Sequence, residues 1–461
     1  MDERGSVLEL SSRRSLLKQS ARGFGYLAMC SLLASEQARA AADLDREKQA
    51  LQPKSPHIPA RAKRIIFLFM EGAMSQLDTF EYKPELQERD GQSGPGGGRL
   101  VGSKFRFSRH GETGTWVSEL YPHVAEHVDR LCFVRGLWTD TPAHPQAVIQ
   151  LHTGTRIASV ARPSLGAWLL YGLGTENTSL PGYVTINPSP NFGGAVNYGS
   201  AFLPSYYEGT KITDRGFLPN LKAAGPGSLQ RRQIDFLQSR NRDLSEISGA
   251  PAALDGLIES WELAFRMQDS IPRLLNFSDE PRHIQEAYGV SEGAGGSFAR
   301  QCLLARRLSE AGVRFVEVRQ GGWDHHNNLH RGLQTNAAAT DQPVAALLAD
   351  LEQRGLLEET LVLFGSEFGR MPTAQGVDGR DHNITGYPMW LAGAGVKPGF
   401  SWGGTDEFGL RAVEQRMHTT DLHATLLALL GLDHERLTFR YAGRDFRLTD
   451  VEGQVASEIF Q

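Results

Sequence analysis

Aspartate and histidine side chains gather in four separate segments of the chain, behind short apolar runs or at the start of a helical pattern. Short, continuous apolar runs are typical of buried strands, and ligands of open α/β sheets bind outside the carboxyl ends of the strands. Side chains that are distant in the sequence are therefore expected to meet at one edge of a sheet. The residues concerned are Asp78, Asp324, His326, Asp381, His382 and His418.

This mixture of carboxylate and imidazole donors indicates a metal or catalytic site. Such donors suit borderline divalent ions such as zinc, manganese or iron better than they suit an all-oxygen calcium site. Two such ions can stabilise the attacking and leaving oxygens of a displacement at phosphorus or sulfur. The alternative interpretation of each Asp-His pair, taken alone, is a hydrogen-bonding pair on the surface. The joint occurrence behind successive strands is what favours a site.

The elements that would position these side chains alternate between two kinds of pattern. Apolar runs bounded by polar or glycine residues predict strands, and amphipathic stretches between several of them predict helices. Alternation of this kind is typical of a doubly wound α/β sheet. The predicted strands cover residues 65–70, 131–134, 183–186, 314–318, 361–364 and 389–392, and the clearest helices cover 298–310, 343–354 and 422–430.

Three stretches depart from this alternation. Residues 41–63 are polar and carry three prolines, which predicts a linker before an α/β domain at 64–461. Residues 90–102 are rich in glycine and predict a mobile loop. Residues 229–289 are charged and helical in pattern, and we expect them to form a helical insertion packed on the sheet domain.

Composition excludes several classes of protein. The formal net charge of −5 over 461 residues gives no overall basic surface for nucleic acid or anionic membranes. After the N-terminal segment, no uninterrupted apolar run in the sequence is long enough to span a bilayer. Cys132 and Cys302 are too few for a disulfide framework, although an exported protein could pair them, and they lack the C-x-x-C spacing of a thiolate metal site. We expect both in the core.

The N-terminal segment predicts export. Arg13 and Arg14 stand before two leucines and a lysine, a short apolar stretch follows, and residues 38–40 form a small-x-small cleavage site. Paired arginines in this arrangement predict a twin-arginine signal peptide at residues 1–40, with the twin-arginine translocase as the partner. The mature protein is then periplasmic or secreted, without a stable membrane span.

One motif competes with this interpretation. Residues 123–127 spell H-x-x-E-H, the inverted zinc-protease motif. Its helix leads directly into the predicted strand at 131–134, with an apolar stripe that favours a structural role. No nucleophile elbow and no phosphate-binding glycine loop behind a strand is present.

Six stretches together resemble a bacterial family catalogued as domain of unknown function 1501, a distant member of the alkaline phosphatase and sulfatase superfamily. The resemblance covers nearly the whole mature chain and is strongest at residues 67–80, 321–326, 366–370, 379–382, 418–427 and 441–450. It implies a three-layer α/β/α sandwich around a mostly parallel sheet. It also implies one or two divalent ions at the carboxyl edge, with zinc, manganese or calcium as candidates.

The resemblance also implies ligands. Asp381 and His382 look like the late Asp-His pair that holds one ion in phosphatase-like members, and Asp324 and His418 look like ligands of a second. Spacing leaves open whether His326 or Asn328 completes the set. The Asp normally found directly after the first strand is replaced by Glu71, and Asp78 lies seven residues further on.

Residues 142–156 look like the sulfatase segment that carries the nucleophile, and its nucleophile position holds His144. Without Cys or Ser there, a formylglycine mechanism is not available. Thr139 or Thr141 could substitute, or water could attack with His144 as the general base. A further alternative is that hydrolysis has been lost and only a pocket remains.

The function expected from these observations is an exported, metal-dependent hydrolase of phosphate or sulfate esters. Arg156 and Arg380 are the candidates for binding the anionic group of a small ester or of a sulfated or phosphorylated glycan. The main alternative is a non-catalytic periplasmic or cell-envelope binding protein on the same fold. A redox or metal-storage role is a third.

Overall fold

In the computed structural model, residues 50–95, 97–157, 160–177, 179–213, 227–248, 263, 265–268, 270–290 and 298–461 are described. The predicted signal peptide and residues 249–262 lie outside these ranges. Within them, no helix combines the length and the apolar character needed to cross a bilayer.

The centre of the molecule is a nine-stranded sheet. Each strand of its core runs parallel to its neighbours except β11, which is antiparallel to both β4 and β8. In spatial order the strands are β12 (Phe400–Trp402), β4 (Leu131–Trp138), β11 (Tyr387–Gly393), β8 (Thr360–Gly365), β1 (Arg64–Met70), β7 (Phe315–Gln320), β5 (Tyr183–Ile186) and β6 (Thr210–Ile212), with β15 (Met417–His418) beside β4.

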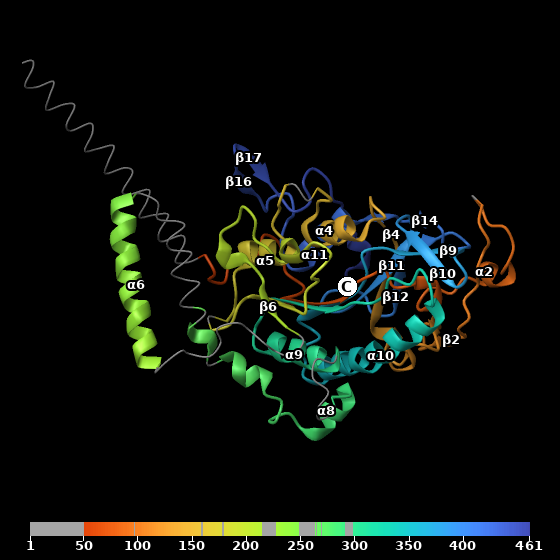
Figure 1. Cartoon of the computed structure of the whole chain (residues 1–461), viewed down its shortest axis with the longest axis horizontal. Helices are drawn as coiled ribbons and strands as arrows, with labels where there is room; N and C mark the ends of the chain where they lie inside the picture. Colours follow the sequence, from red (N-terminus) through yellow and green to blue (C-terminus); the bar gives the residue numbers. More distant parts are fainter. Residues whose placement is uncertain are drawn as a thin grey trace, which may run out of the picture.

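Helices cover both faces of this sheet (Figure 1). One face carries α4 (His144–Thr153), α5 (Leu165–Leu173) and α11 (Thr419–Leu429), and the other carries α3 (Pro122–Ala125), α8 (Arg282–Tyr288), α9 (Phe298–Glu310) and α10 (Leu329–Gln353). A hydrophobic core lies between the sheet and the helices on each face. Successive side chains of β1 point to opposite faces, so they pack alternately into one core and the other. The predicted three-layer α/β/α sandwich with a mostly parallel sheet is confirmed.

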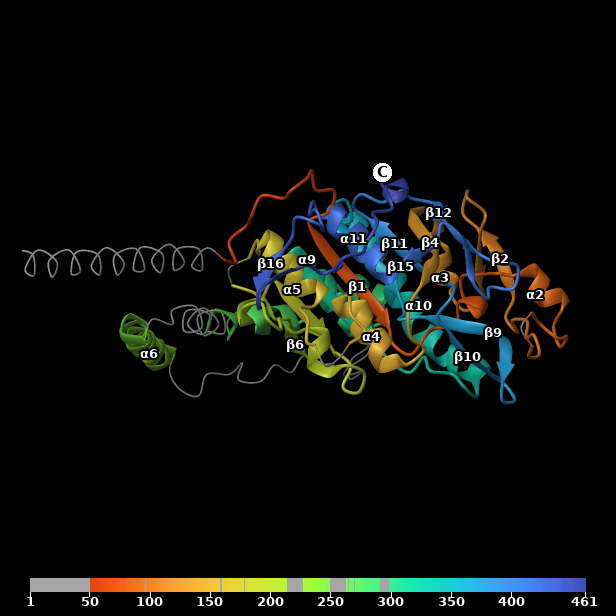
Figure 2. The same cartoon turned by 90° about the horizontal axis from the view of Figure 1, so that it is seen from above.

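The remaining elements are peripheral. Short hairpins and helices flank the sheet, and α6 lies apart from it in both views (Figures 1 and 2). They are α2 (Pro84–Glu88), the hairpins β2 (Phe107–His110) with β3 (Thr115–Ser118), β9 (Gly369–Gln375) with β10 (Gly379–Asn383), β13 (Gly404–Thr405) with β14 (Ala412–Glu414), and β16 (Phe439–Tyr441) with β17 (Arg444–Phe446), and α6 (Gly227–Ser248).

Two segments differ from the sequence expectation. Helix α10 begins at Leu329, well before the predicted start at residue 343, and Pro343 lies inside it. Buried Leu329, Leu333 and Ala337 continue the stripe that Val344 begins, and this burial outweighs the cost of an interior proline. Residues 54–62 also run along the domain, where their backbone hydrogen bonds reach the ends of α5 and α11.

The two cysteines of the described domain, Cys132 and Cys302, are buried and unpaired, as expected. Burial raises the pKa of the Cys132 thiol to about 12, so this thiol is not a reactive nucleophile.

A buried histidine on α11 is expected to make stability depend on pH. His423 packs against α4 with its Nε2 2.7 Å from the Leu151 carbonyl oxygen, and its Nδ1 is buried without a hydrogen-bond partner. Burial lowers the pKa of His423 to about 4. The unfolded chain, with an ordinary histidine pKa near 6.5, therefore binds the proton more tightly than the folded one.

The contribution of His423 is accordingly present above about pH 6.5 and is lost as the pH falls toward 4, by up to about 3 kcal/mol. Glutamine keeps a donor for Leu151 but does not titrate. We expect urea unfolding of His423→Gln to lose less free energy than wild type between pH 7 and pH 5. Identical losses in the two proteins would show that this histidine does not titrate as its burial implies.

Candidate metal centre

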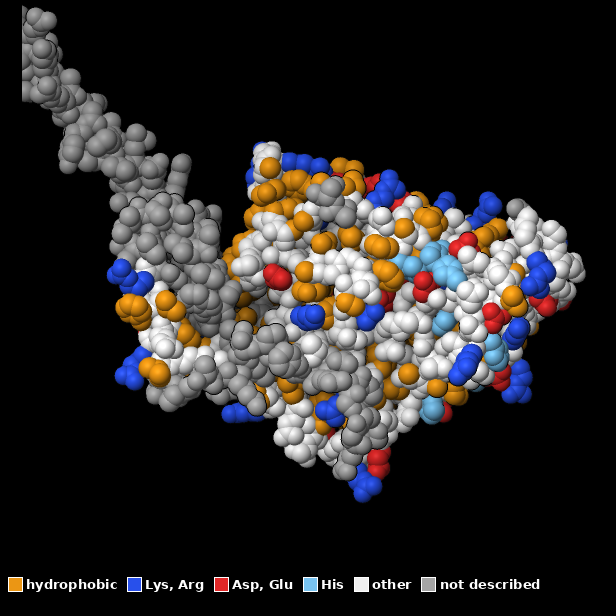
Figure 3. All heavy atoms as spheres, viewed as in Figure 1, with side chains coloured by type: hydrophobic (Ala, Val, Ile, Leu, Met, Phe, Trp, Pro, Cys, Tyr) orange, Lys and Arg blue, Asp and Glu red, His pale blue; other side chains and the backbone are white. Residues whose placement is uncertain are grey.

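Four side chains converge at the carboxyl edge of the sheet. Donor atoms of His144, Asp324, His326 and His382 all lie within 4.8 Å of one another. Oδ1 of Asp324 is the common neighbour: it lies 2.9 Å from Nε2 of His326, 3.2 Å from Nε2 of His144 and 3.4 Å from Nε2 of His382. We call these four residues the metal group. In the space-filling view, histidine atoms gather beside acidic ones in one place on this face (Figure 3).

The fold brings the metal group together from three places. His144 is the first residue of α4, which follows β4. Asp324 and His326 lie in the loop between β7 and α10, and His382 lies on β10, in the hairpin that follows β8. Because β4, β7 and β8 are parallel, their carboxyl ends lie at one edge of the sheet.

All three histidines present the same nitrogen to the centre of the group. Nδ1 of His144 lies 2.6 Å from Oε1 of Glu367, and Nδ1 of His382 lies 2.6 Å from the Pro142 carbonyl oxygen. Nδ1 of His326 contacts Oε1 of Gln375. An acceptor at Nδ1 holds the proton there and leaves Nε2 free to bind a cation, which is how metal-binding histidines are oriented in proteins.

Glu367 is the partner that fixes His144. Its side chain is fully buried and also accepts the backbone N–H of Gly72, 3.0 Å from Oε1. The His144 ring stacks between Phe192 and Phe368, with ring centroids 5.1 and 4.8 Å away. This ring has little freedom to turn, so its Nε2 stays directed at Asp324.

Arg370 fixes the position of the Asp324 carboxylate, as Glu367 fixes the His144 ring. Its guanidinium is fully buried, and NH2 donates to Oδ1 of Asp324 at 2.7 Å. The other hydrogen bonds of its guanidinium reach backbone carbonyl oxygens of three segments, those of Gly72, Ala73, Trp323 and Arg380. The loop behind β1, the loop behind β7 and strand β10 are therefore joined by one side chain.

The electrostatics of the group favour a cation. Burial alone would raise the pKa of Asp324, but the neighbouring His144 and His382 imidazoles and the Arg370 guanidinium hold it well below its usual range. Burial alone would lower the pKa of His144, but Asp324 and Glu367 raise it to about 9. Without an ion, a proton on His144 offsets the carboxylate charge, and a bound metal ion would replace that proton.

The donors present fit a divalent transition ion. Three imidazoles and one carboxylate form a set that zinc and its neighbours accept. Nε2 of His144 is buried and has no well-aligned hydrogen-bond partner, which a metal ion would satisfy. The Asp324 side chain is 40% exposed, so a substrate can reach the group from solvent.

Sequence comparison assigns the chain to a family. A model described as a protein of unknown function, DUF1501, matches residues 62–460. The chain belongs to this family. The match spans the α/β domain and confirms the resemblance drawn from the motifs. No curated protein matches the chain.

Solved structures similar to this DUF1501 protein are distant in sequence. The lipoteichoic acid synthase LtaP from Listeria monocytogenes is 9% identical, with 87% of this chain and 79% of that chain covered and a TM-score of 0.40. An alkaline phosphatase superfamily protein from Vibrio parahaemolyticus is 11% identical (85% and 74% covered, TM-score 0.39). The PsFucS1 sulfatase from Pseudoalteromonas sp. is 12% identical (87% and 72% covered, TM-score 0.36). At these TM-scores we draw nothing further from the likenesses.

Two of the residues expected to act at the site pair with each other instead. Nε of Arg380 lies 2.9 Å from Oδ2 of Asp78, and both side chains are almost completely buried. Ser75 also donates to Asp78, at 2.5 Å. In this DUF1501 protein Asp78 and Arg380 therefore lie outside the metal group and neutralise each other, so neither is free to bind an ion or an anionic substrate.

Asp381 also lies outside the metal group. It is exposed on β10, and its Oδ1 accepts the backbone N–H of His382 at 2.8 Å. The register of β10 against β9 shifts between Arg380 and His382, where Asp381 lies, and the Asp381 carboxylate is not among the donor atoms that converge with His382. Of the expected Asp-His pair, only His382 belongs to the metal group.

His418 and Arg156 gather around Asp140 rather than around Asp324. Nε2 of His418 lies 3.2 Å from Oδ2 of Asp140, and its Nδ1 accepts at the start of α11, where Asp421 completes a capping box. Arg156 approaches Oδ1 of Asp140 at 3.9 Å. Arg156 therefore lies beside Asp140, not beside Asp324.

The competing H-x-x-E-H segment has a structural role in this fold. His123 contacts Oδ2 of Asp341 at 2.6 Å, and the same carboxylate accepts backbone N–H groups at the start of α3. Sequence reasoning assigned no role to Glu367, Arg370 or Asp140. The sequence feature that could have identified Glu367 and Arg370 is their position shortly after β8, because the carboxyl end of that strand lies at the site.

Proposed function

We propose that this chain is an exported, metal-dependent hydrolase of phosphate or sulfate esters. The observation that carries the proposal is the shared orientation of the metal group. Three histidines have Nδ1 against an oxygen acceptor and direct Nε2 at one carboxylate oxygen that solvent reaches. His144, Asp324, His326 and His382 would hold one divalent ion.

When bound, the ion would neutralise charge on the ester and polarise its phosphorus–oxygen or sulfur–oxygen bond. Residues of the chain hold the ligand side chains in the positions that this step requires. Glu367 and Arg370 hold His144 and Asp324, and the rings of Phe192 and Phe368 pack against the His144 ring. In hydrolysis, the oxygen of water bonds to phosphorus or sulfur, the bond from that atom to the alcohol oxygen breaks, and the alcohol leaves with a proton that came from the water.

His144 fits a ligand better than a general base. Its Nδ1 is engaged by Glu367, and its Nε2 points into the metal group, so neither nitrogen is free to take a proton from water. We therefore assign His144 to the ion. This assignment differs from the sequence interpretation, in which His144 stood at the nucleophile position and acted on water.

Turnover of 4-nitrophenyl phosphate and 4-nitrophenyl sulfate tests the proposal. Purified mature protein supplied with zinc or manganese is expected to release 4-nitrophenol from at least one of them, and a chelator is expected to stop the release. Retention of the metal without turnover of either ester would favour the binding-protein alternative and contradict the hydrolase.

Export by the twin-arginine route is part of the proposal and concerns residues outside the described ranges. Arg13→Lys with Arg14→Lys keeps the charge but removes the pair that the translocase receptor recognises. We expect the double variant to accumulate as full-length precursor in the cytoplasm, seen by fractionation and immunoblotting. Normal export of that variant would exclude this route.

A further inference from the structure

A pocket of about 300 Å³ lies at the edge of the sheet that β12 forms, where β2, β4 and β12 are close together (Figure 2). Arg135 of β4 and Ser401 of β12 line it, and these two strands pair in parallel. The rest of its lining comes from residues 80–83, from the hairpin of β2 and β3 and from β13. The four residues of the metal group are not among those that line it, so a ligand bound here is separate from an ester at the metal group.

One wall of the pocket is aromatic. The rings of Tyr82 and Trp116 lie 4.6 Å apart, and the Phe107 ring lies 5.1 Å from that of Tyr82. Arg109 of β2 lies over the Trp116 ring, 5.1 Å from its centroid. Tyr82 and Trp116 remain partly exposed, and both line the pocket. Rings held in this way offer a preformed apolar surface to a flat ligand.

Beside this wall, a buried carboxylate holds a lysine. Glu81 is only 3% exposed, and its Oε1 lies 3.1 Å from Nζ of Lys83 and accepts the hydroxyl group of Thr405. Lys83 also donates to the carbonyl oxygen of Thr405 at 3.2 Å. Tyr82 stands between Glu81 and Lys83 in the sequence, so the lysine and the aromatic wall belong to one short segment. Because Glu81 is buried, a ligand meets the ammonium group rather than the carboxylate.

Arg135 is a second cation of the pocket. Its Nε donates to the hydroxyl group of Ser401 at 2.7 Å, and its NH1 donates to the carbonyl oxygen of Phe80 at 2.9 Å. The guanidinium also lies over the Phe133 ring, 4.6 Å from the centroid. These contacts fix the plane of the guanidinium, and NH2 has no hydrogen-bond partner among the described residues. NH2 is therefore available to an acceptor on a ligand.

The charges of this pocket do not balance. Lys83 and Arg135 stand against the single carboxylate of Glu81, so one positive charge is left over. A ligand with one negative charge would complete the balance, and the aromatic wall beside the two cations favours a ligand that also carries a ring.

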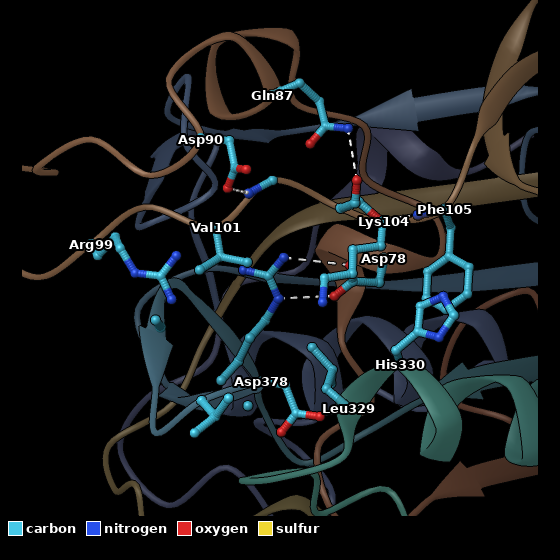
Figure 4. A pocket seen from close by; sticks show the side chains of 16 residues that line it. Asp78, Gln87, Asp90, Arg99, Val101, Lys104, Phe105, Leu329, His330 and Asp378 are labelled. Atoms are coloured by element: carbon cyan, nitrogen blue, oxygen red, sulfur yellow. Dashed lines mark hydrogen bonds and ion pairs between the residues drawn. The ribbon is translucent and has the colours of Figure 1, made fainter.

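A pocket beside the hairpin of β9 and β10, of about 230 Å³, differs in this respect (Figure 4). Its wall at residues 99–105 overlaps the segment expected to be mobile, but backbone hydrogen bonds attach that wall to β9. Asp78 and Arg380 neutralise each other there. Its other charged side chains are two cations and two carboxylates, namely Arg99, Lys104, Asp90 and Asp378. Of these two pockets, only the one beside β12 therefore favours an anion.

We infer that the pocket beside β12 binds a carboxylate that carries an aromatic ring. The carboxylate accepts hydrogen bonds from NH2 of Arg135 and from Lys83, and the ring packs against Tyr82 and Trp116. A small aromatic acid and the end of a peptide whose last residue is aromatic share this chemistry. The inference does not rest on the proposed function, because neither the lining nor the ligand involves the metal group.

Calorimetric titration of the whole mature protein with phenylacetate tests this site. Benzyl alcohol supplies the ring without the carboxylate, and acetate supplies the carboxylate without the ring. Each is expected to bind at least about tenfold more weakly than phenylacetate. A tripeptide that ends in phenylalanine, with a free or an amidated C-terminus, separates the two sources. Binding of the free form but not of the amide assigns the site to peptide ends, and binding of phenylacetate alone assigns it to small acids.

Two variants locate the site. Arg135→Gln is expected to weaken phenylacetate binding about tenfold, and Trp116→Leu about fivefold. Lys104→Gln and Tyr441→Leu are the matched controls, because they remove an exposed cation and an exposed aromatic ring from elsewhere on the protein. Both controls should bind phenylacetate as wild type does. Turnover of 4-nitrophenyl esters should be the same in all four variants, so its loss in wild type would contradict the hydrolase and not this site.

Absence of phenylacetate binding to wild type would overturn the inference, as would equal binding of phenylacetate and benzyl alcohol. Unchanged affinity in both Arg135→Gln and Trp116→Leu would place the ligand elsewhere and have the same consequence. Circular dichroism shows whether each variant is folded. If Arg135→Gln does not fold, Trp116→Leu decides, because Trp116 lies partly exposed on a peripheral hairpin.

Discussion

Replacing Asp324 with asparagine is expected to reduce ester hydrolysis at least about a hundredfold. Asp324 supplies the only carboxylate of the metal group, and its Oδ1 is the atom that all three Nε2 nitrogens and Arg370 approach. The amide keeps the shape but removes the negative charge. The ion then loses its anionic ligand, and Arg370 is left buried beside the ion without the charge that offset its own.

The measurement is the rate of 4-nitrophenol release at saturating metal, compared with wild type and with Asp381→Asn. Asp381→Asn is a suitable control because it removes the same charge from an exposed position directly before His382. Asp381→Asn should keep nearly full activity. Circular dichroism of each variant shows whether the fold is intact, and equal activity in Asp324→Asn and wild type would contradict the assignment.

The second large effect is expected on stability, at the buried pair of Asp78 and Arg380. Their side chains are only 3% and 1% exposed. Arg380 also donates to the Met371 carbonyl oxygen, and Asp78 accepts from Ser75. Removing one partner leaves a buried charge without compensation, which costs about 3–5 kcal/mol.

Asp78→Leu or Arg380→Met alone should therefore lower the free energy of unfolding in urea by about that amount. Combining Asp78→Leu with Arg380→Met removes both charges and should restore a large part of the loss, because buried ion pairs often exchange for apolar pairs at little cost. Asp445→Ala provides the exposed control: its pair with Arg440 is more than half exposed, so a change of at most about 1 kcal/mol is expected. Additive losses in the double variant would contradict this picture of the pair.

The strands were predictable from the sequence because a strand that is buried on both faces consists of a continuous apolar run. Continuous apolar runs such as 65–70 and 361–364 can belong to few elements other than central strands, and the structure places β1 and β8 there. The edge at which polar side chains meet follows from the parallel arrangement of those strands. The convergence of Asp324, His326 and His382 was therefore within reach of sequence reasoning.

What the sequence left open is which way a side chain points. Asp381 and His382 are neighbours, and only the pairing of β10 with β9 decides that His382 lies in the metal group while Asp381 faces solvent. Nothing in the sequence indicates a partner for Asp78, but in the structure its carboxylate accepts a hydrogen bond from Arg380, 302 residues away. Glu367 and Arg370 act through long-range hydrogen bonds, which no local spacing encodes.

The metal content of the purified protein tests the central claim most directly. By inductively coupled plasma mass spectrometry we expect about one divalent transition ion per chain in wild type and in Asp381→Ala. His382→Ala and His326→Ala should contain clearly less at unchanged circular dichroism, since each removes an Nε2 from the metal group. A wild-type protein that remains free of metal after incubation with zinc and manganese, or histidine variants with full occupancy, would contradict the site.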